Sequence, residues 1–189
     1  MAGKKKQSLW LLIFLIFISG GAYLPIWFTN KQEILKVGEL PKLFMSLIAI
    51  TLVAGFAVKV WLGANLQTIE GKIQPIFIQN MVDGKSLSDS GEYLKLASQQ
   101  IDYQLKLTQL NMIFVAIGLF LLVYSFKLKS RINKELSETS KKKINSWLFI
   151  IPSILLYLLF IGLEMSSVAL IWSIIPMVLI MQRKINTNI

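Results

Sequence analysis

Two ionisable side chains stand inside otherwise apolar stretches of the sequence, and they are the first candidates for chemistry. Lys59 lies in the apolar stretch 44–64, and Glu164 lies in the longer apolar stretch 147–181. Charged groups inside a bilayer are costly, and those that occur often line paths for ions or protons. If the fold brings Lys59 and Glu164 together, the pair could bind a cation or carry a proton.

Each of the two residues also has a simpler explanation, which we favour. The aliphatic stem of Lys59 can carry its ammonium group to the membrane surface beside Trp61. Glu164 follows Gly162 and Leu163, where a helical hairpin would turn, so its carboxylate would stay solvated at the surface. If the hairpin instead re-enters the bilayer without crossing it, Glu164 would be buried and could bind a cation or a proton.

The composition excludes several kinds of active site. The chain contains no Cys and no His, which rules out a thiolate nucleophile, a Cys/His zinc site and a His general base. The motifs GxxxxGK[ST], HExxH, GxSxG and GxGxxG are also absent. We therefore expect no enzymatic activity, no metal site and no cofactor.

The distribution of apolar residues predicts the fold class. Of the 189 residues, 54% are apolar and 16% are charged, a balance typical of membrane proteins. A helix needs about 20 apolar residues to cross a bilayer. The stretches 8–28, 44–64 and 110–126 each fit one crossing, whereas 147–181 fits a hairpin of two helices, 147–163 and 165–181. We expect an all-α integral membrane protein with about five transmembrane helices, or four if the C-terminal hairpin is re-entrant.

The first apolar stretch contains an interruption. Gly20 and Gly21 stand in its middle and are followed by Pro25. Interrupted helices can mark binding sites in transporters, but a simple kink is the commoner outcome, and we expect a kink here.

The segment 65–109 is the longest polar stretch, and two apolar stripes at helical spacing run along it. The first consists of Leu66, Ile69, Ile73 and Ile76, and the second of Tyr93, Leu96, Gln100, Tyr103, Leu107 and Leu110. Turn-forming residues at 82–91 separate the stripes, Asp89 and Glu92 resemble a capping box, and Pro75 predicts a break or kink. We expect an extramembrane αα-hairpin. Its apolar faces would pack against each other, against another chain or on the membrane surface.

These elements divide the sequence into three parts. Residues 1–64 form an N-terminal two-span unit, 65–109 the extramembrane hairpin, and 110–189 a C-terminal membrane unit that includes a basic loop at 127–146 and the helical hairpin 147–181.

The 20 Lys and Arg residues predict the orientation. Basic residues concentrate in cytoplasmic loops, and the segments 28–43 and 127–146 and the C-terminus together carry most of them. This places 65–109 outside, although Lys4, Lys5 and Lys6 would favour a cytoplasmic N-terminus. We expect the loop 127–146 to attract anionic lipid and not nucleic acid, because it lacks aromatic residues for base stacking. The composition suggests a bacterial plasma (inner) membrane.

Two functions fit these features. The first is a non-enzymatic membrane subunit or scaffold that forms a homo-oligomer or joins other membrane subunits through the hairpin 65–109. The candidate assembly face is the pair of stripes, above all Leu66, Ile69, Ile73, Ile76, Tyr93, Leu96, Tyr103 and Leu107. The alternative is a small homo-oligomeric channel or pore-forming effector, for example in stress or phage defence, in which Lys59 and Glu164 act as intramembrane polar groups.

Overall fold

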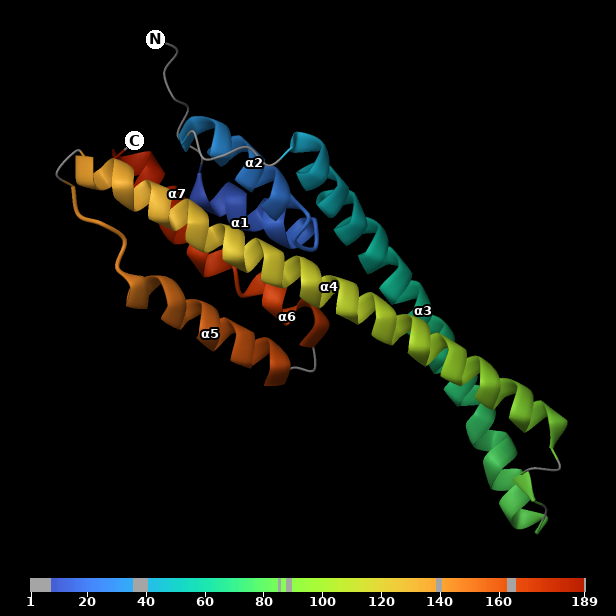
Figure 1. Ribbon diagram of the computed structural model, residues 1–189. Helices are drawn as coiled ribbons and strands as arrows, with labels where there is room; N and C mark the ends of the chain where they lie inside the picture. Colours follow the sequence, from blue (N-terminus) through green and yellow to red (C-terminus); the bar gives the residue numbers. More distant parts are fainter. Residues whose placement is uncertain are drawn as a thin grey trace. The chain divides into compact units, whose positions relative to one another are not determined.

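The computed structural model describes residues 8–35, 41–84, 86–87, 90–138, 141–162 and 166–188. These residues form helices and no strand, so the all-helical part of the predicted fold class is confirmed. The helices are α1 (Leu9–Ile18), α2 (Tyr23–Leu35), α3 (Lys42–Val82), α4 (Gly91–Glu138), α5 (Ser146–Gly162), α6 (Ser166–Trp172) and α7 (Ile175–Asn188), drawn in Figure 1.

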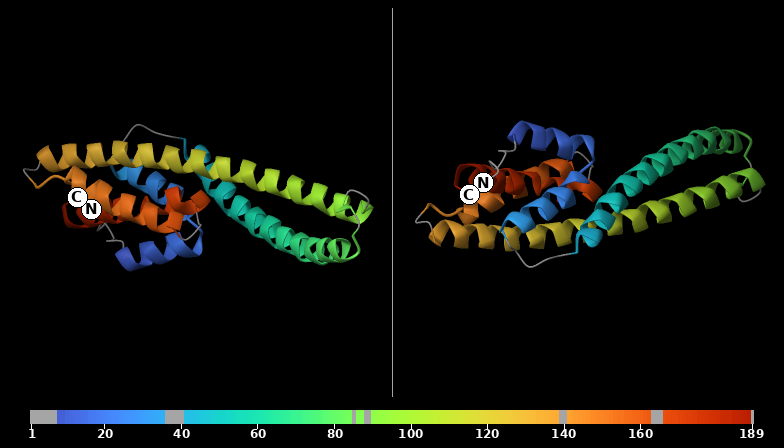
Figure 2. Two further views of the ribbon diagram at one scale, coloured as in Figure 1. Left: turned by 90° about the horizontal axis from the view of Figure 1, so that it is seen from below. Right: turned by 90° about the horizontal axis from the view of Figure 1, so that it is seen from above.

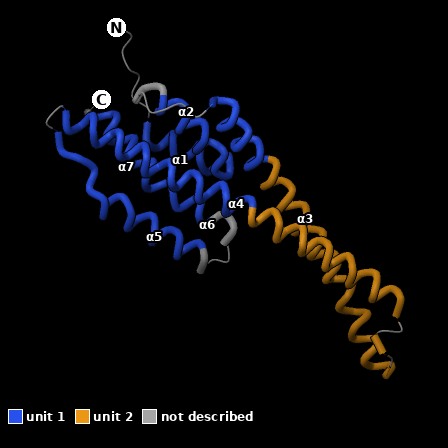
Figure 3. Tube along the Cα trace, viewed as in Figure 1, with its two compact units in different colours: residues 1–53, 113–189 blue, residues 54–112 orange. Residues whose placement is uncertain are grey.

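The chain divides into two compact units (Figure 3). Residues 1–53 and 113–189 form unit 1, and residues 54–112 form unit 2. Unit 1 thus joins the N-terminal and C-terminal segments, which the sequence analysis places in separate parts. The helices α3 and α4 each contribute one end to unit 1 and the other end to unit 2.

Two of the described helices, α3 and α4, are long and apolar enough to cross a membrane by length and composition. The helices α1 and α5 are apolar but shorter. At 1.5 Å per residue, the 10 residues of α1 span about 15 Å, roughly half of a bilayer's hydrocarbon core. The prediction of five spanning helices therefore remains a prediction.

The first apolar stretch is broken into two helices, so the expectation of a simple kink is wrong. Gly20 and Gly21 both adopt positive φ angles, 58° and 93°, a backbone conformation that glycine tolerates best. The Gly21 amide donates to the Ile16 carbonyl at 2.9 Å, which ends α1. The Ser19 hydroxyl then accepts a hydrogen bond from the Tyr23 amide at 3.0 Å and caps α2.

A second break divides the predicted arm 165–181 into α6 and α7. The Ser173 amide still bonds to the Ala169 carbonyl at 2.9 Å, and α7 begins two residues later. Pro176 lies in the first turn of α7, where a missing amide hydrogen costs little. The residues at which the sequence analysis places the hairpin turn, 163–165, lie outside the described residues.

The two breaks pack against each other in unit 1. A Cβ atom at Gly21 would lie 2.8 Å from Ile171 Cγ2 and 3.9 Å from Trp172 Nε1. Around this contact, α7 packs beside α1 and α5, and α5 also packs beside α6 (Figures 1 and 2). The glycines therefore provide both the turn and the space that the close approach requires.

In unit 2, α3 and α4 lie alongside each other and are joined at the turn-rich segment (Figure 2). The helix α3 continues through Pro75, so the predicted break does not occur there. Proline removes one helical hydrogen bond, to the Gly71 carbonyl, and Gly71 is exposed, so solvent can satisfy that carbonyl. At the start of α4 the Ser90 hydroxyl accepts a hydrogen bond from the Tyr93 amide at 3.3 Å. Asp89 lies outside the described residues.

A glycine on α4 allows a close contact in unit 1 and generates a testable prediction. A Cβ atom at Gly118 would lie 2.8 Å from Leu170 Cδ2 and 3.1 Å from Leu170 Cβ, whereas one at Gly63 would meet nothing within 4 Å. Both glycines are helical, so Gly118→Val and Gly63→Val change helix propensity alike. We expect Gly118→Val to be less stable than Gly63→Val by about 1–3 kcal/mol because it overpacks the contact.

The measurement is thermal unfolding of the purified protein in detergent, followed by tryptophan fluorescence. Equal midpoints for Gly118→Val and Gly63→Val would show that α4 does not approach Leu170 as closely as described.

Candidate functional site: a buried polar network in unit 1

A chain of buried polar side chains connects α2 to α7. Trp27 Nε1 donates a hydrogen bond to Gln182 Oε1 at 2.9 Å, and Gln182 Nε2 donates to Asn186 Oδ1 at 2.6 Å. The side chains of Trp27 and Gln182 are fully buried. Because a buried polar group without a partner is costly, these bonds fix α2 and α7 in one register.

A second buried hydrogen bond connects α2 to α4. The Tyr124 hydroxyl donates to Gln32 Oε1 at 2.7 Å, and both residues are buried. The ring of Phe28 meets the Tyr124 ring edge to face, with centroids 5.4 Å apart, and also meets the Trp27 ring at 5.3 Å. The two hydrogen bonds and the aromatic contacts therefore join α2, α4 and α7 at one place, which we call the polar network.

Lys31 precedes Gln32 of this network in α2 and is only 8% exposed. Burial lowers the pKa of its ammonium group below the usual value, because desolvation disfavours the charged form. None of the described residues supplies its ammonium group with a hydrogen-bond acceptor. The sequence analysis counts Lys31 among the basic residues that set the orientation, whereas the structure places it in the interior of unit 1.

The segment predicted as a basic loop at 127–146 is helical in its first part, which belongs to α4, and its last residues contact α4. The helix α4 continues to Glu138. The segment that follows is held by Asn133, whose side chain accepts a hydrogen bond from the Ile144 amide at 2.7 Å and donates one to the Ile144 carbonyl at 3.2 Å. Lys129 Nζ donates to Ser146 Oγ at 2.8 Å and lies over the Phe149 ring. Lys184 Nζ on α7 donates to the Lys142 carbonyl at 3.1 Å, so the segment also contacts the C-terminal helix.

The chemistry of the polar network follows from its members. They are the side-chain amides of Gln32, Gln182 and Asn186, the phenol of Tyr124 and the indole of Trp27. Among the described residues there is no group of three or more His, Cys, Asp or Glu side chains that could hold a metal ion. The network pairs neutral donors with neutral acceptors, an arrangement that holds helices together and offers no activated nucleophile.

The sequence analysis proposed Lys59 and Glu164 as intramembrane polar groups. Lys59 is half-buried on the part of α3 that belongs to unit 2. Glu164 lies outside the described residues, so a pair between them stays a prediction.

The two predicted apolar stripes lie on the inner side of the hairpin in unit 2. Ile69 is buried, and the other stripe residues are half-buried: Leu66, Ile73, Ile76, Tyr93, Leu96, Gln100, Tyr103, Leu107 and Leu110. The Tyr103 ring meets the Trp61 ring with centroids 5.8 Å apart, and Gln100 Nε2 donates to Glu70 Oε1 at 3.4 Å. This geometry is that of two arms packed against each other, and the extramembrane position and the assembly role of the stripes stay predictions.

The polar network itself was not expected from the sequence. Gln32 and Gln182 lie at the ends of apolar stretches, where polar residues normally mark only the membrane boundary. Trp27 has the position of an interfacial tryptophan, yet it is buried. A usable signal was the spacing of four residues between Gln182 and Asn186, which places both on one helix face.

Comparisons with protein-family models, with curated proteins and with solved structures find no match. The function is therefore argued from the residues and geometry of this chain.

The Tyr124–Gln32 hydrogen bond generates a prediction with a matched control. Tyr124→Phe removes the hydroxyl and keeps the ring that packs on Phe28, while Tyr157→Phe removes a hydroxyl from a half-buried residue on α5 outside the network. We expect Tyr124→Phe to lower the free energy of unfolding by about 1 kcal/mol and Tyr157→Phe to change it much less.

Denaturant unfolding of both variants in the same detergent, monitored by fluorescence, compares them directly. A larger loss for Tyr157→Phe would contradict a stabilising role of the network.

Proposed function

We propose that the chain is a non-enzymatic integral membrane protein, a subunit or scaffold that assembles with copies of itself or with a larger membrane complex. The observation that carries the membrane part is the exposure of apolar side chains along the two long helices. In the most apolar windows of α3 and α4, only 28% and 22% of the residues are buried. A core helix of a water-soluble protein would be mostly buried there, and these windows lie far from the N-terminus, where a signal sequence stands.

The exposed apolar residues are large and numerous on α3. They include Leu43, Leu47, Ile50, Val53, Val60 and Trp61. Exposure of this extent in water would cost about 25 cal/mol for each Å² of apolar surface, and large apolar patches on soluble proteins normally mark a binding surface. Lipid chains would cover the same surface without that cost.

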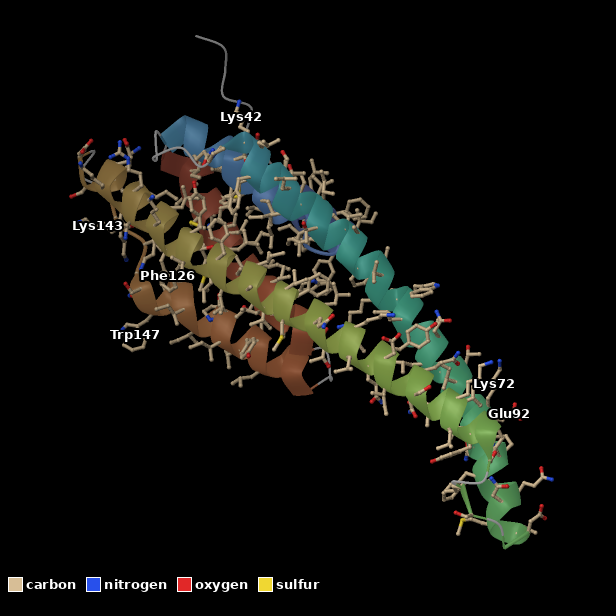
Figure 4. All side chains as sticks on the ribbon, turned by 45° about the vertical axis from the view of Figure 1, so that its right-hand side comes forward. Lys42, Lys72, Glu92, Phe126, Lys143 and Trp147 are labelled. Carbon is tan, nitrogen blue, oxygen red and sulfur yellow. The ribbon has the colours of Figure 1, made fainter. Side chains whose placement is uncertain are left out.

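The helix α5 supports the same proposal. Leu148, Ile151, Leu155 and Leu158 are all exposed along it, and Figure 4 shows Trp147, at its start, projecting away from the neighbouring helices. A tryptophan at the end of an apolar helix suits the membrane interface. The groove between α3 and α4 in unit 1 is likewise apolar, has a volume of about 370 Å³ and is lined by Phe44, Leu47, Ile48, Thr51, Ala116, Ile117 and Phe120.

The scaffold part of the proposal rests on what the polar groups do. Buried side chains such as Trp27, Gln32 and Gln182 bond to partners on other helices and hold those helices together, and seven of the basic residues lie in the segment 127–146. Lys141, Lys142 and Lys143 are exposed there. Each basic residue near an anionic membrane surface contributes about 1 kcal/mol of attraction, so this segment would anchor one end of unit 1 to the cytoplasmic leaflet of a bacterial plasma membrane.

The proposed orientation gives a prediction that uses the absence of native cysteines. Ser86 lies in the turn between α3 and α4, and Ser137 is exposed near the end of α4. We expect Ser86→Cys to react with a membrane-impermeant maleimide in intact cells and Ser137→Cys to react only after the membrane is permeabilised. The opposite pattern would invert the orientation, and labelling of both variants in intact cells would mean that α4 does not cross the membrane.

The proposed assembly gives a second prediction. Tagged protein extracted in mild detergent from its own host should have a native mass above that of a 21.5 kDa chain with its detergent, either as a homo-oligomer or with stoichiometric partner chains. Native mass spectrometry measures both. A monomer without partners would contradict the scaffold, and a loss of membrane potential on expression in host cells would favour a channel in its place.

A further inference from the structure

The helix α4 carries a second apolar stripe in unit 2, on the side turned away from α3. The stripe consists of Leu94, Ser98, Ile101, Leu105, Thr108 and Met112, whose spacing alternates strictly between four and three residues. The four apolar members are between 52% and 68% exposed, and the two hydroxyl residues are also exposed. We call this stripe the outer seam.

A hairpin of two helices needs one apolar face on each helix, and α4 has two. Its inner face packs on α3, as the Trp61–Tyr103 contact shows. The outer seam has the spacing of the a and d positions of a coiled coil, a narrow stripe that suits one further helix. Charged or polar residues border the outer seam on both sides, with Lys95 and Asp102 on one side and Gln104 on the other. A lipid-facing surface would be broader and would lack these charges.

The two hydroxyl residues of the outer seam are compatible with burial. Ser98 Oγ donates to the Lys95 carbonyl at 2.8 Å, and Thr108 Oγ1 donates to the Gln104 carbonyl at 2.9 Å. Both hydroxyl donors are thus satisfied within α4. Covering the seam would leave no unpaired hydroxyl hydrogen, and an unpaired one would be costly.

The outer seam is complementary to itself in antiparallel orientation. With two copies of α4 aligned about a twofold axis between Ser98 and Ile101, Leu94 faces Leu105 of the second copy, and Ile101 faces Ser98, so a large side chain meets a small one near the axis. Lys95 of each copy then lies near Asp102 of the other, whose carboxylate also pairs with Lys106 of its own helix at 2.6 Å. The second copy thus adds two opposite-charge contacts. In a parallel pair Ser98 would face Ser98, Thr108 would face Thr108, and Lys95 would face no acid.

We propose that the outer seam binds the outer seam of a second copy of this chain as an antiparallel helix pair. The proposal rests on the proposed function, since it names the partner and the surface through which the scaffold assembles. In this register residues 94–105 of the two copies face each other, over about 18 Å of helix. A seam of this length is weak in solution, and confinement of two copies to one membrane raises their effective concentration.

Disulfide cross-linking tests the register, because the chain has no native cysteine to compete. Leu94→Cys and Leu105→Cys chains carrying different tags are co-expressed and oxidised in native membranes. The antiparallel pair predicts a disulfide between the two different tags, and at least several-fold less disulfide when either variant is expressed alone. The control is Gln99→Cys, an exposed position outside the seam, paired with Leu105→Cys.

Charge reversal tests the same contact independently. Lys95→Glu should reduce the mixed disulfide several-fold, and adding Asp102→Lys should restore it, because the opposite charges then face each other again. Thermal unfolding of each variant in detergent, followed by tryptophan fluorescence and measured beforehand, checks that each variant is folded.

Three results would overturn the proposal: disulfides within each tag alone, which indicate a parallel pair; equal yields for Gln99→Cys and Leu94→Cys; and no disulfide at all. If the native mass still exceeds a monomer in these cases, the scaffold stands and another surface or partner carries the assembly. A monomeric mass together with no disulfide removes both proposals.

Discussion

The left-handed backbone at Gly20 and Gly21 is the constraint on which the packing of unit 1 depends. It ends α1 after 10 residues and lets α2 begin in a new direction, which brings Trp27 and Gln32 to the partners that they bond on α7 and α4. Gly21 also provides the space for Ile171, which lies at the break between α6 and α7. A residue with a Cβ atom in place of Gly21 would have an unfavourable φ angle, and its Cβ would lie 2.8 Å from Ile171 Cγ2. The polar network therefore depends on the break between α1 and α2.

A second constraint governs α4, which is apolar on opposite faces. Its inner face packs on α3 within unit 2. In the part of α4 that belongs to unit 1, Gly118 and Tyr124 contact other helices. One helix thus serves several packing interactions because its side chains change partner along its length. The outer seam has heptad spacing, yet its four apolar side chains are between 52% and 68% exposed, and this mismatch between pattern and packing favours a further helix as its partner.

The sequence predicted the features that depend on periodicity and composition. Helical spacing located both arms around the turn-rich segment 82–91, and the apolar stretches located α3 and α4, although the prediction of a break at Pro75 was wrong because an exposed Gly71 carbonyl tolerates the lost bond. The polar network could not be predicted, because Trp27 and Gln182 are 155 positions apart in the sequence. Only tertiary packing brings them together, and in the sequence each residue stands where a residue of the membrane boundary is expected. The spacing of the outer seam is present in the sequence, but the sequence analysis did not identify it, because two interleaved stripes on one helix cannot be assigned to inside and outside without knowing where α3 lies.

The polar and apolar groups of this chain are distributed in a way that fits a membrane environment and an assembly role at once. In unit 1 the buried polar side chains satisfy one another, as Trp27, Gln182 and Asn186 do, while large apolar residues of α3 and α5 face outward. In water this arrangement would expose the surface that normally drives folding. In a bilayer the driving force between helices comes instead from close contacts and hydrogen bonds, and unit 1 has both, at Gly118 and in the polar network. The outer seam differs from the lipid-type surface of α3 because charged residues border it. Lipid chains pack poorly on an apolar seam that charged residues border, and exposure of the seam to water is also unfavourable. A second copy of the same helix covers the apolar side chains and brings opposite charges together.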